Sequence, residues 1–148
     1  MKRILPLLLA VLLLLVLSAC AGDGVWVEAP EIGVRLFLPH GWSWEEQSGY
    51  RPGLRLWPDD DPAADLELIR WHSDYNPSCG TGYRHGSRVT SAGETLFLQW
   101  EKGSRKVWLN LEWNGRRNFH LTGTLTHEQW ERYQADLLRI ADTVTFPT

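Results

Sequence analysis

The residues best suited to chemistry gather in one stretch of the chain, between positions 72 and 85. His72, Cys79 and His85 supply two imidazoles and one thiol in this stretch. Imidazole nitrogen and thiolate sulfur are ligands that zinc and copper accept. Because the spacing matches no established pattern of metal ligands, the stretch is interpreted first as a long solvated loop. A metal site formed by these three residues stays a weaker hypothesis.

Other catalytic patterns are missing from the sequence. The acidic run 59–65 lacks the glycine and one of the ligands that an EF-hand loop needs, so we expect a solvated acidic turn there. No Gly-x-Ser-x-Gly elbow occurs, and no local spacing enforces a pair of carboxylates. His120 lies in the middle of an expected strand, where we expect an ordinary half-exposed side chain. The sequence therefore predicts a protein that is not an enzyme, with no catalytic residue and no cofactor.

Tryptophan is the most unusual feature of the composition, with nine residues. Trp100 and Trp113 alternate in phase with leucines, which favours the core. Four others lie out of phase with their apolar neighbours or at strand ends, and these are Trp44, Trp57, Trp71 and Trp108. An exposed indole face can stack on sugar rings or attract cations, whereas the alternative is packing beneath a loop or a second layer. Trp57, Trp71 and Trp108 form the candidate binding surface, with a glycan as the ligand.

Apolar residues alternate with polar ones along most of the chain, which is typical of half-buried strands. The strands are expected at Val34–Leu38, Trp42–Glu46, Leu54–Trp57, Leu66–Trp71, Thr95–Glu101, Val107–Trp113 and Phe119–Thr122. The first is followed by a turn through His40 and Gly41, and Asn114-Gly115 suits a two-residue hairpin turn.

The period changes from two to 3.6 after residue 125. Thr126 and Gln129 have the spacing of a capping box at the start of a helix. The apolar positions then recur at helical intervals, at Trp130, Tyr133, Leu137, Ile140 and Ala141. The sequence therefore predicts an α+β fold, an antiparallel β-sheet of about six strands with a C-terminal amphipathic helix packed on one face.

The N-terminus has the composition of an export signal. Lys2 and Arg3 precede an apolar run from Ile4 to Leu17, which is shorter than the roughly 20 residues that a spanning helix needs. The next residues, Leu17-Ser18-Ala19-Cys20, resemble the lipobox of bacterial lipoproteins. This resemblance implies cleavage before Cys20, a diacylglyceryl group on its thiol and an acyl chain on the new amine. It also implies a protein held on the cell membrane, on the periplasmic side of the outer membrane in a cell with two membranes, because Ala21 and not an aspartate follows the cysteine.

The expected organisation is simple. Residues 1–19 form the signal peptide, residues 20–24 the lipidated cysteine and a short tether, and residues 25–148 a single globular domain. Lipidation of Cys20 leaves Cys79 as the one remaining cysteine. The chain carries a net charge of −3, and loss of Lys2 and Arg3 makes the mature protein more acidic still. This balance disfavours nucleic acid as a partner.

Two segments resemble a known family. They are Phe37-Leu38-Pro39-His40-Gly41-Trp42 and the residues from Leu137 to Phe146. The strand, the Pro-x-Gly-Trp turn and the final helix are similar to PsbP-like proteins and to DcrB-like bacterial lipoproteins. The resemblance implies an antiparallel sheet flanked by helices, and an accessory or assembly role.

The expected function is a membrane-anchored envelope lipoprotein. Its role would be a non-catalytic interaction or assembly role, with membrane lipid bound through Cys20 and an envelope protein as partner. The alternative is a module that binds glycan or peptidoglycan through its exposed tryptophans.

Overall fold

The computed structural model describes residues 23–70, 84–102, 105–113 and 119–146. The predicted signal, Cys20 and most of the predicted tether lie outside this range, so export and lipidation stay predictions. The elements are β1 Gly24–Ala29, β2 Val34–Pro39, β3 Trp42–Gln47, β4 Gly53–Pro58, β5 Leu66–Arg70, β6 Arg84–Val89, β7 Thr95–Lys102, β8 Lys106–Trp113, β9 Phe119–Thr126 and α2 His127–Thr143.

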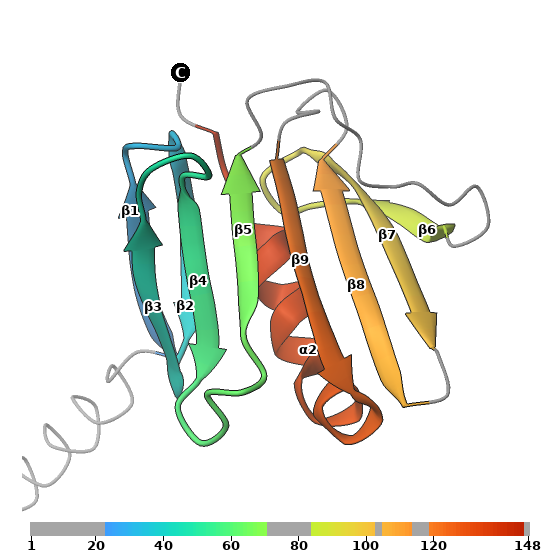
Figure 1. The fold of residues 1–148 in the computed structure, drawn as a ribbon. Coiled ribbons are helices and arrows are strands. Elements are labelled where there is room, and N and C mark those ends of the chain that lie inside the picture. The colour runs from blue at the N-terminus through green and yellow to red at the C-terminus, as the bar shows by residue number, and fades with distance from the viewer. Residues whose placement is uncertain (1–22, 71–83, 103–104, 114–118, 147–148) are drawn as a thin grey trace, which may run out of the picture.

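The domain has two layers. One is a seven-stranded sheet in the order β3-β4-β5-β9-β8-β7-β6, in which all neighbours are antiparallel. The other combines the β1–β2 hairpin and α2, which contact each other and lie on the same side of the large sheet (Figure 1). The predicted α+β fold is confirmed.

The chain forms more strands than the sequence pattern indicated. Strand β6 has little apolar alternation, and it forms because its backbone pairs with β7, with a bulge between Arg84 and Gly86. The hairpin β1–β2 forms a separate sheet of its own. The prediction of a two-residue hairpin turn at Asn114-Gly115 was wrong, because the observed pairing of β8 with β9 does not have the register that such a turn requires. A two-residue turn there would pair Glu112 with residue 117, whereas Glu112 pairs with His120.

The core lies between the two layers. Alternate residues of the central strands point into it, including Leu56, Leu68, Leu111 and Leu121. The register brings Leu68, Leu121 and Leu111 side by side across β5, β9 and β8. Burying one such side chain contributes roughly 1.5–3 kcal/mol, so this apolar row is the main reason for the pairing register.

Helix α2 begins and packs as its sequence predicts. Thr126 accepts a hydrogen bond from the backbone N–H of Gln129, and the Gln129 side chain accepts one from the N–H of Thr126. The buried residues of the helix are Trp130, Tyr133, Leu137, Ile140 and Ala141, the five positions of the expected apolar stripe.

The Pro-x-Gly-Trp turn carries the chain from one layer to the other. Strand β2 ends at Pro39 in the small sheet, and β3 begins at Trp42 in the large one. Gly41 adopts a φ of 85°, a conformation that glycine adopts without the steric cost of a Cβ. Trp42 is buried and its indole N–H donates to Asp136 of α2 at 3.1 Å. The turn therefore also attaches the sheet to the helix.

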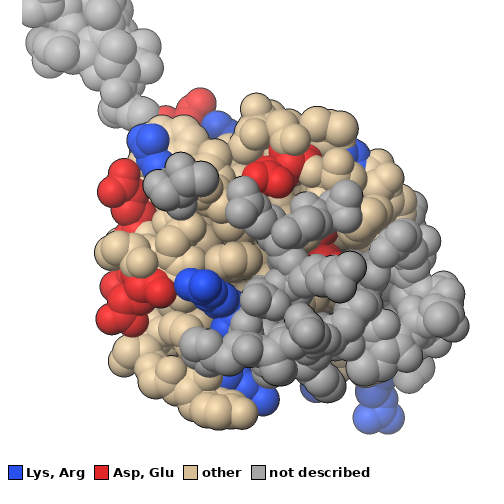
Figure 2. Space-filling view, turned by 90° about the horizontal axis from the view of Figure 1, so that it is seen from above, with Lys and Arg blue, Asp and Glu red and all other residues tan. Residues whose placement is uncertain are grey.

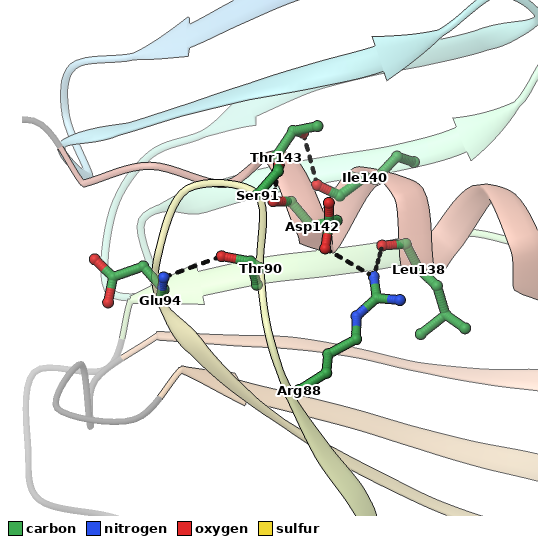
Figure 3. Close-up of polar contacts among 8 residues, drawn as sticks. All are labelled: Arg88, Thr90, Ser91, Glu94, Leu138, Ile140, Asp142 and Thr143. Carbon is green, nitrogen blue, oxygen red and sulfur yellow. Dashed lines mark hydrogen bonds and ion pairs between the residues drawn. The ribbon is translucent and has the colours of Figure 1, made fainter.

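The end of β6 and the turn that follows it contact the C-terminal end of the helix. Arg88 donates to the carbonyl of Leu138 at 2.7 Å and lies 3.2 Å from Asp142 (Figure 3). Ser91 donates to the carbonyl of Asp142 at 2.9 Å. The last turn of α2 has no basic residue of its own. Arg88 supplies the positive charge that a helix C-terminus favours.

Candidate binding site on the open face of the sheet

One face of the large sheet is covered by α2 and the β1–β2 hairpin, and the opposite face is the open face. Polar side chains point to it because they alternate with the buried leucines of β5, β8 and β9. The register places Glu67 beside Thr122, and Thr122 beside Asn110, across the three central strands. The centre of the open face is thus a row of polar groups with no helix of the structure on it (Figure 1).

A shallow groove of about 490 Å³ crosses this row. It is lined by Asp65, Glu67, Trp108, Leu109, Asn110, Thr122, Gly123 and Thr124. Trp108 is 47% exposed and stands opposite Thr124 in the β8–β9 ladder. The volume lies within the range of small-molecule sites, and an indole beside carboxylate, amide and hydroxyl groups can both stack and form hydrogen bonds.

Two carboxylates line the groove, those of Asp65 and Glu67, and Arg55 pairs with Asp65 beside it. The guanidinium of Arg55 donates to Asp65 at 2.7 Å and lies 3.5 Å from Glu45. Its hydrogen bond to Asp65 and the charge of that carboxylate raise the pKa of Arg55 above its ordinary value. Glu67 makes no ion pair within the described ranges. One cation against three carboxylates leaves this part of the face acidic.

The structure separates the predicted tryptophans. Trp108 is exposed, as expected for the candidate surface. Trp57 is half-buried, lies three strands away in the same sheet and is covered by Arg55, whose guanidinium is 5.1 Å from the indole centre. Trp71 lies outside the described residues. Trp44 is exposed on the edge strand β3.

The prediction that Trp113 lies in the core is confirmed. Trp113 is completely buried and packs edge-to-face on Phe146 at 5.9 Å. Trp100 lies on β7 opposite Leu109, and its side chain is not among those described.

The expectation for His120 was wrong. Its side chain is fully buried, and its Nδ1 lies 3.2 Å from the amide oxygen of Asn110. Ile69, its partner in the ladder, is also buried. The strand period places His120 on the polar side of β9, but burial depends on what packs over that end of the face, which the period does not encode.

The acidic turn 59–61 is more than a solvated turn. Asp60 accepts from the hydroxyl of Tyr133 at 2.8 Å and forms an ion pair with Arg132. Asp61 accepts from the Gln129 side-chain amide at 2.9 Å. Burial, together with the hydrogen bond to Asp60, raises the pKa of Tyr133 to about 12. The turn therefore attaches the large sheet to the first half of α2.

A second, smaller recess of about 280 Å³ lies beside this contact. It is lined by His40, Gly41, Trp42, Pro58, Asp59, Asp60, Tyr133 and Asp136. Its principal polar groups already satisfy one another, through the bonds of Trp42 to Asp136 and of Tyr133 to Asp60. The polar groups of this recess therefore serve to attach the helix to the sheet, and we do not assign a ligand to it.

The predicted metal ligands are not brought together in the described structure. His72 and Cys79 lie outside the described residues, and His85 lies on β6 with its side chain not described. Among the residues that are described, no three His, Cys, Asp or Glu side chains are grouped so that they could hold a metal ion. The metal site stays a hypothesis.

Two further observations concern the surface. In the described ranges, no helix is both long enough and apolar enough to cross a membrane. Seen from above, both acidic and basic side chains are exposed on this end of the molecule (Figure 2).

No family model and no curated protein matches this chain. Among solved structures it is similar to the cyanobacterial PsbP (CyanoP) of Synechocystis sp. PCC 6803, with a TM-score of 0.53 and 12% identity. The match covers 86% of this chain and 95% of that protein. The chain has a PsbP-like fold.

The PsbP-like fold confirms the resemblance at the level of architecture. At 12% identity the likeness concerns the fold alone, and no binding residue is transferred from it. The DcrB-like resemblance stays a prediction.

Sequence reasoning found Trp108 but missed the polar residues around it. Glu67 lies between Leu66 and Leu68, and Asn110 lies between Leu109 and Leu111. The available signal was a polar residue between two buried leucines, which occurs both on β5 and on β8. It was not used because the sequence does not show that β5, β9 and β8 are neighbours in this order.

Proposed function

We propose that this chain is a lipid-anchored protein of the bacterial cell envelope that binds a partner without catalysis. The lipobox Leu17-Ser18-Ala19-Cys20 supports the anchor. In a cell with two membranes, the protein resides on the periplasmic side of the outer membrane. The PsbP-like fold is compatible with the accessory or assembly role that the family resemblance implies.

The observation that carries the binding proposal is the groove on the open face. It combines an exposed indole with polar side chains that point to the open face, chiefly Glu67, Thr122 and Thr124. Thr124 is exposed, and Glu67 and Thr122 are half-buried. A concave, acidic and aromatic surface is suited to a polar partner with basic side chains. The leading partner is accordingly another envelope protein.

A photocrosslinking experiment tests this proposal in cells. A photoreactive residue replaces Thr124 in the groove, and the control replaces Ala135, which is exposed on α2 in the opposite layer. We expect one dominant protein to be crosslinked from position 124 and not from position 135. The crosslink should disappear in the Cys20→Ala protein, which cannot be anchored. Equal crosslinking from both positions would contradict a partner site in the groove.

A glycan is the second candidate ligand, and it is favoured by Trp108. An indole face stacks on the C–H groups of a sugar ring, and carboxylate and amide groups bind its hydroxyls. We expect Trp108→Ala to weaken binding of soluble peptidoglycan fragments at least tenfold. Trp44→Ala, an exposed tryptophan on the edge strand, is the matched control and should leave binding unchanged. Absence of measurable binding by the unaltered protein rejects this candidate.

A further inference from the structure

The outer side of the β1–β2 hairpin exposes an aromatic pair. Trp26 on β1 and Phe37 on β2 face each other in the ladder, with ring centres 5.6 Å apart in an edge-to-face arrangement. Trp26 is 53% exposed on this side. Its neighbour Val25 is 56% exposed at the start of β1, on the other face of the strand, where it stands opposite Leu38. Two adjacent apolar residues are thus left in contact with solvent at the start of the described chain.

Two arginines frame this pair. The guanidinium of Arg35 lies 4.5 Å from the centre of the Trp26 ring, and that of Arg139 lies 5.2 Å from the centre of the Phe37 ring. Arg35 is 3.6 Å from Glu28, and Arg139 is 3.7 Å from Asp23. These exposed ion pairs are long, and such pairs contribute little to stability. The guanidinium groups can therefore exchange their carboxylate partners for other anions.

The hairpin is close to the predicted lipid anchor. The four residue steps from Cys20 to Gly24 span at most about 14 Å, and two further steps reach Trp26 after about 7 Å more. Trp26 therefore lies within roughly 21 Å of the cysteine that would carry the lipid. An indole with an apolar body and a polar N–H is a side chain that favours the membrane interface.

We propose that the outer side of the β1–β2 hairpin, formed by Trp26, Phe37 and Arg35 together with Arg139 of α2, lies on the lipid headgroups beside the anchor. This inference rests on the proposed lipid anchoring. The occupant is a bilayer surface with zwitterionic headgroups, because the surface pairs each guanidinium with a carboxylate. The arginines face the lipid phosphates, and Glu28 and Asp23 face the amines.

The orientation has a consequence for the groove. The hairpin belongs to the layer opposite the open face (Figure 1). A hairpin that rests on the membrane turns the groove around Trp108 away from it. The anchor and the hairpin together present the groove to partners in the surrounding compartment, where the anchor alone would leave the domain free to rotate on its tether.

The test uses full-length lipidated protein in phosphatidylethanolamine-containing vesicles, with Cys79→Ser to remove the second thiol. An environment-sensitive fluorophore is attached at Glu28→Cys, and in a control protein at Val89→Cys. Glu28 lies on the outer side of β1, two residues after Trp26, and its side chain is 74% exposed. Val89 is 70% exposed on β6, at the far edge of the sheet from β3. Vesicle flotation reports the anchoring, and brominated lipids report the depth of the label.

We expect the label at position 28 to be blue-shifted and strongly quenched, and the label at position 89 to be unaffected. Trp26→Ala should reduce the quenching at position 28 several-fold, whereas Trp108→Ala, on the opposite layer, should not. Flotation with neither label quenched overturns the orientation and leaves the anchor intact. A protein that does not float overturns the anchor and this inference together. Shielding of position 28 in cells but not in vesicles identifies a protein partner and overturns the lipid contact.

Discussion

Replacement of Arg88 with methionine should lower the free energy of unfolding by about 2 kcal/mol. Methionine keeps the apolar stem of the side chain and removes its charge and its hydrogen bonds. Arg88 is the residue of the β6–β7 hairpin that donates to the end of α2 through Leu138 and Asp142 (Figure 3). The substitution therefore removes the polar contacts between the β6–β7 hairpin and α2 and leaves most of the packing in place.

The magnitude follows from three losses and one gain. The charged hydrogen bond to the Leu138 carbonyl, at 2.7 Å, contributes about 2 kcal/mol. The ion pair with Asp142, whose side chains are 37% and 30% exposed, contributes about 0.5 kcal/mol, and the cation at the helix C-terminus about 0.5 kcal/mol. Against these, the Nε of Arg88 is buried with no hydrogen-bond partner among the described residues, and its removal recovers about 1 kcal/mol.

The assay is equilibrium unfolding in urea of the unlipidated Cys20→Ala protein, followed by tryptophan fluorescence. The loss corresponds to a decrease of about 8 °C in the melting temperature of a domain of this size. Arg105→Met is the control, because Arg105 is exposed and forms no ion pair with another described residue. The reasoning is refuted if Arg88→Met unfolds within about 0.5 kcal/mol of the parent protein, a margin typical of surface substitutions.

Two other features give predictions of the same kind. Thr126→Ala removes the helix cap and should cost about 1 kcal/mol in a urea titration, whereas Thr124→Ala, an exposed threonine two residues earlier, should cost almost nothing; equal losses would contradict the capping role. Tyr133 has a pKa of about 12 in the folded protein against 10 ordinarily. Below pH 10 the phenol is protonated in both states, and between pH 10 and 12 only the unfolded state ionises, so stability should fall over this range. Urea midpoints at about pH 9 and about pH 11 should therefore differ less in Tyr133→Phe than in the parent, and an unchanged difference argues against the raised pKa.

The helix and the central meander were predictable because their signals are local. The capping pair Thr126 and Gln129 are three residues apart, and the stripe from Trp130 to Ala141 follows the helical period. The strands β7, β8 and β9 follow one another in the chain and in the sheet. Local periodicity therefore found both their residues and their pairing.

The strands whose partners are distant in sequence were harder to place. Strand β5 pairs with β9, more than 50 residues away, and this pairing brings Glu67 to Thr122 and Asn110. The groove exists because of that one long-range pairing. The contacts of the acidic turn could not be predicted for the same reason, since its partners on α2 are about 70 residues further along the chain.

The sequence by itself determined the class of the fold, the helix with its buried face and the core position of Trp113, and it named Trp108 as a candidate for the surface. Each of these follows from residue type and period, which act between neighbours in the chain. Only the tertiary structure decided that the open face carries a groove, that His120 is buried and that the acidic turn holds the helix. These depend on which elements pack together, and packing is decided by the summed burial of the whole core, which no single segment encodes.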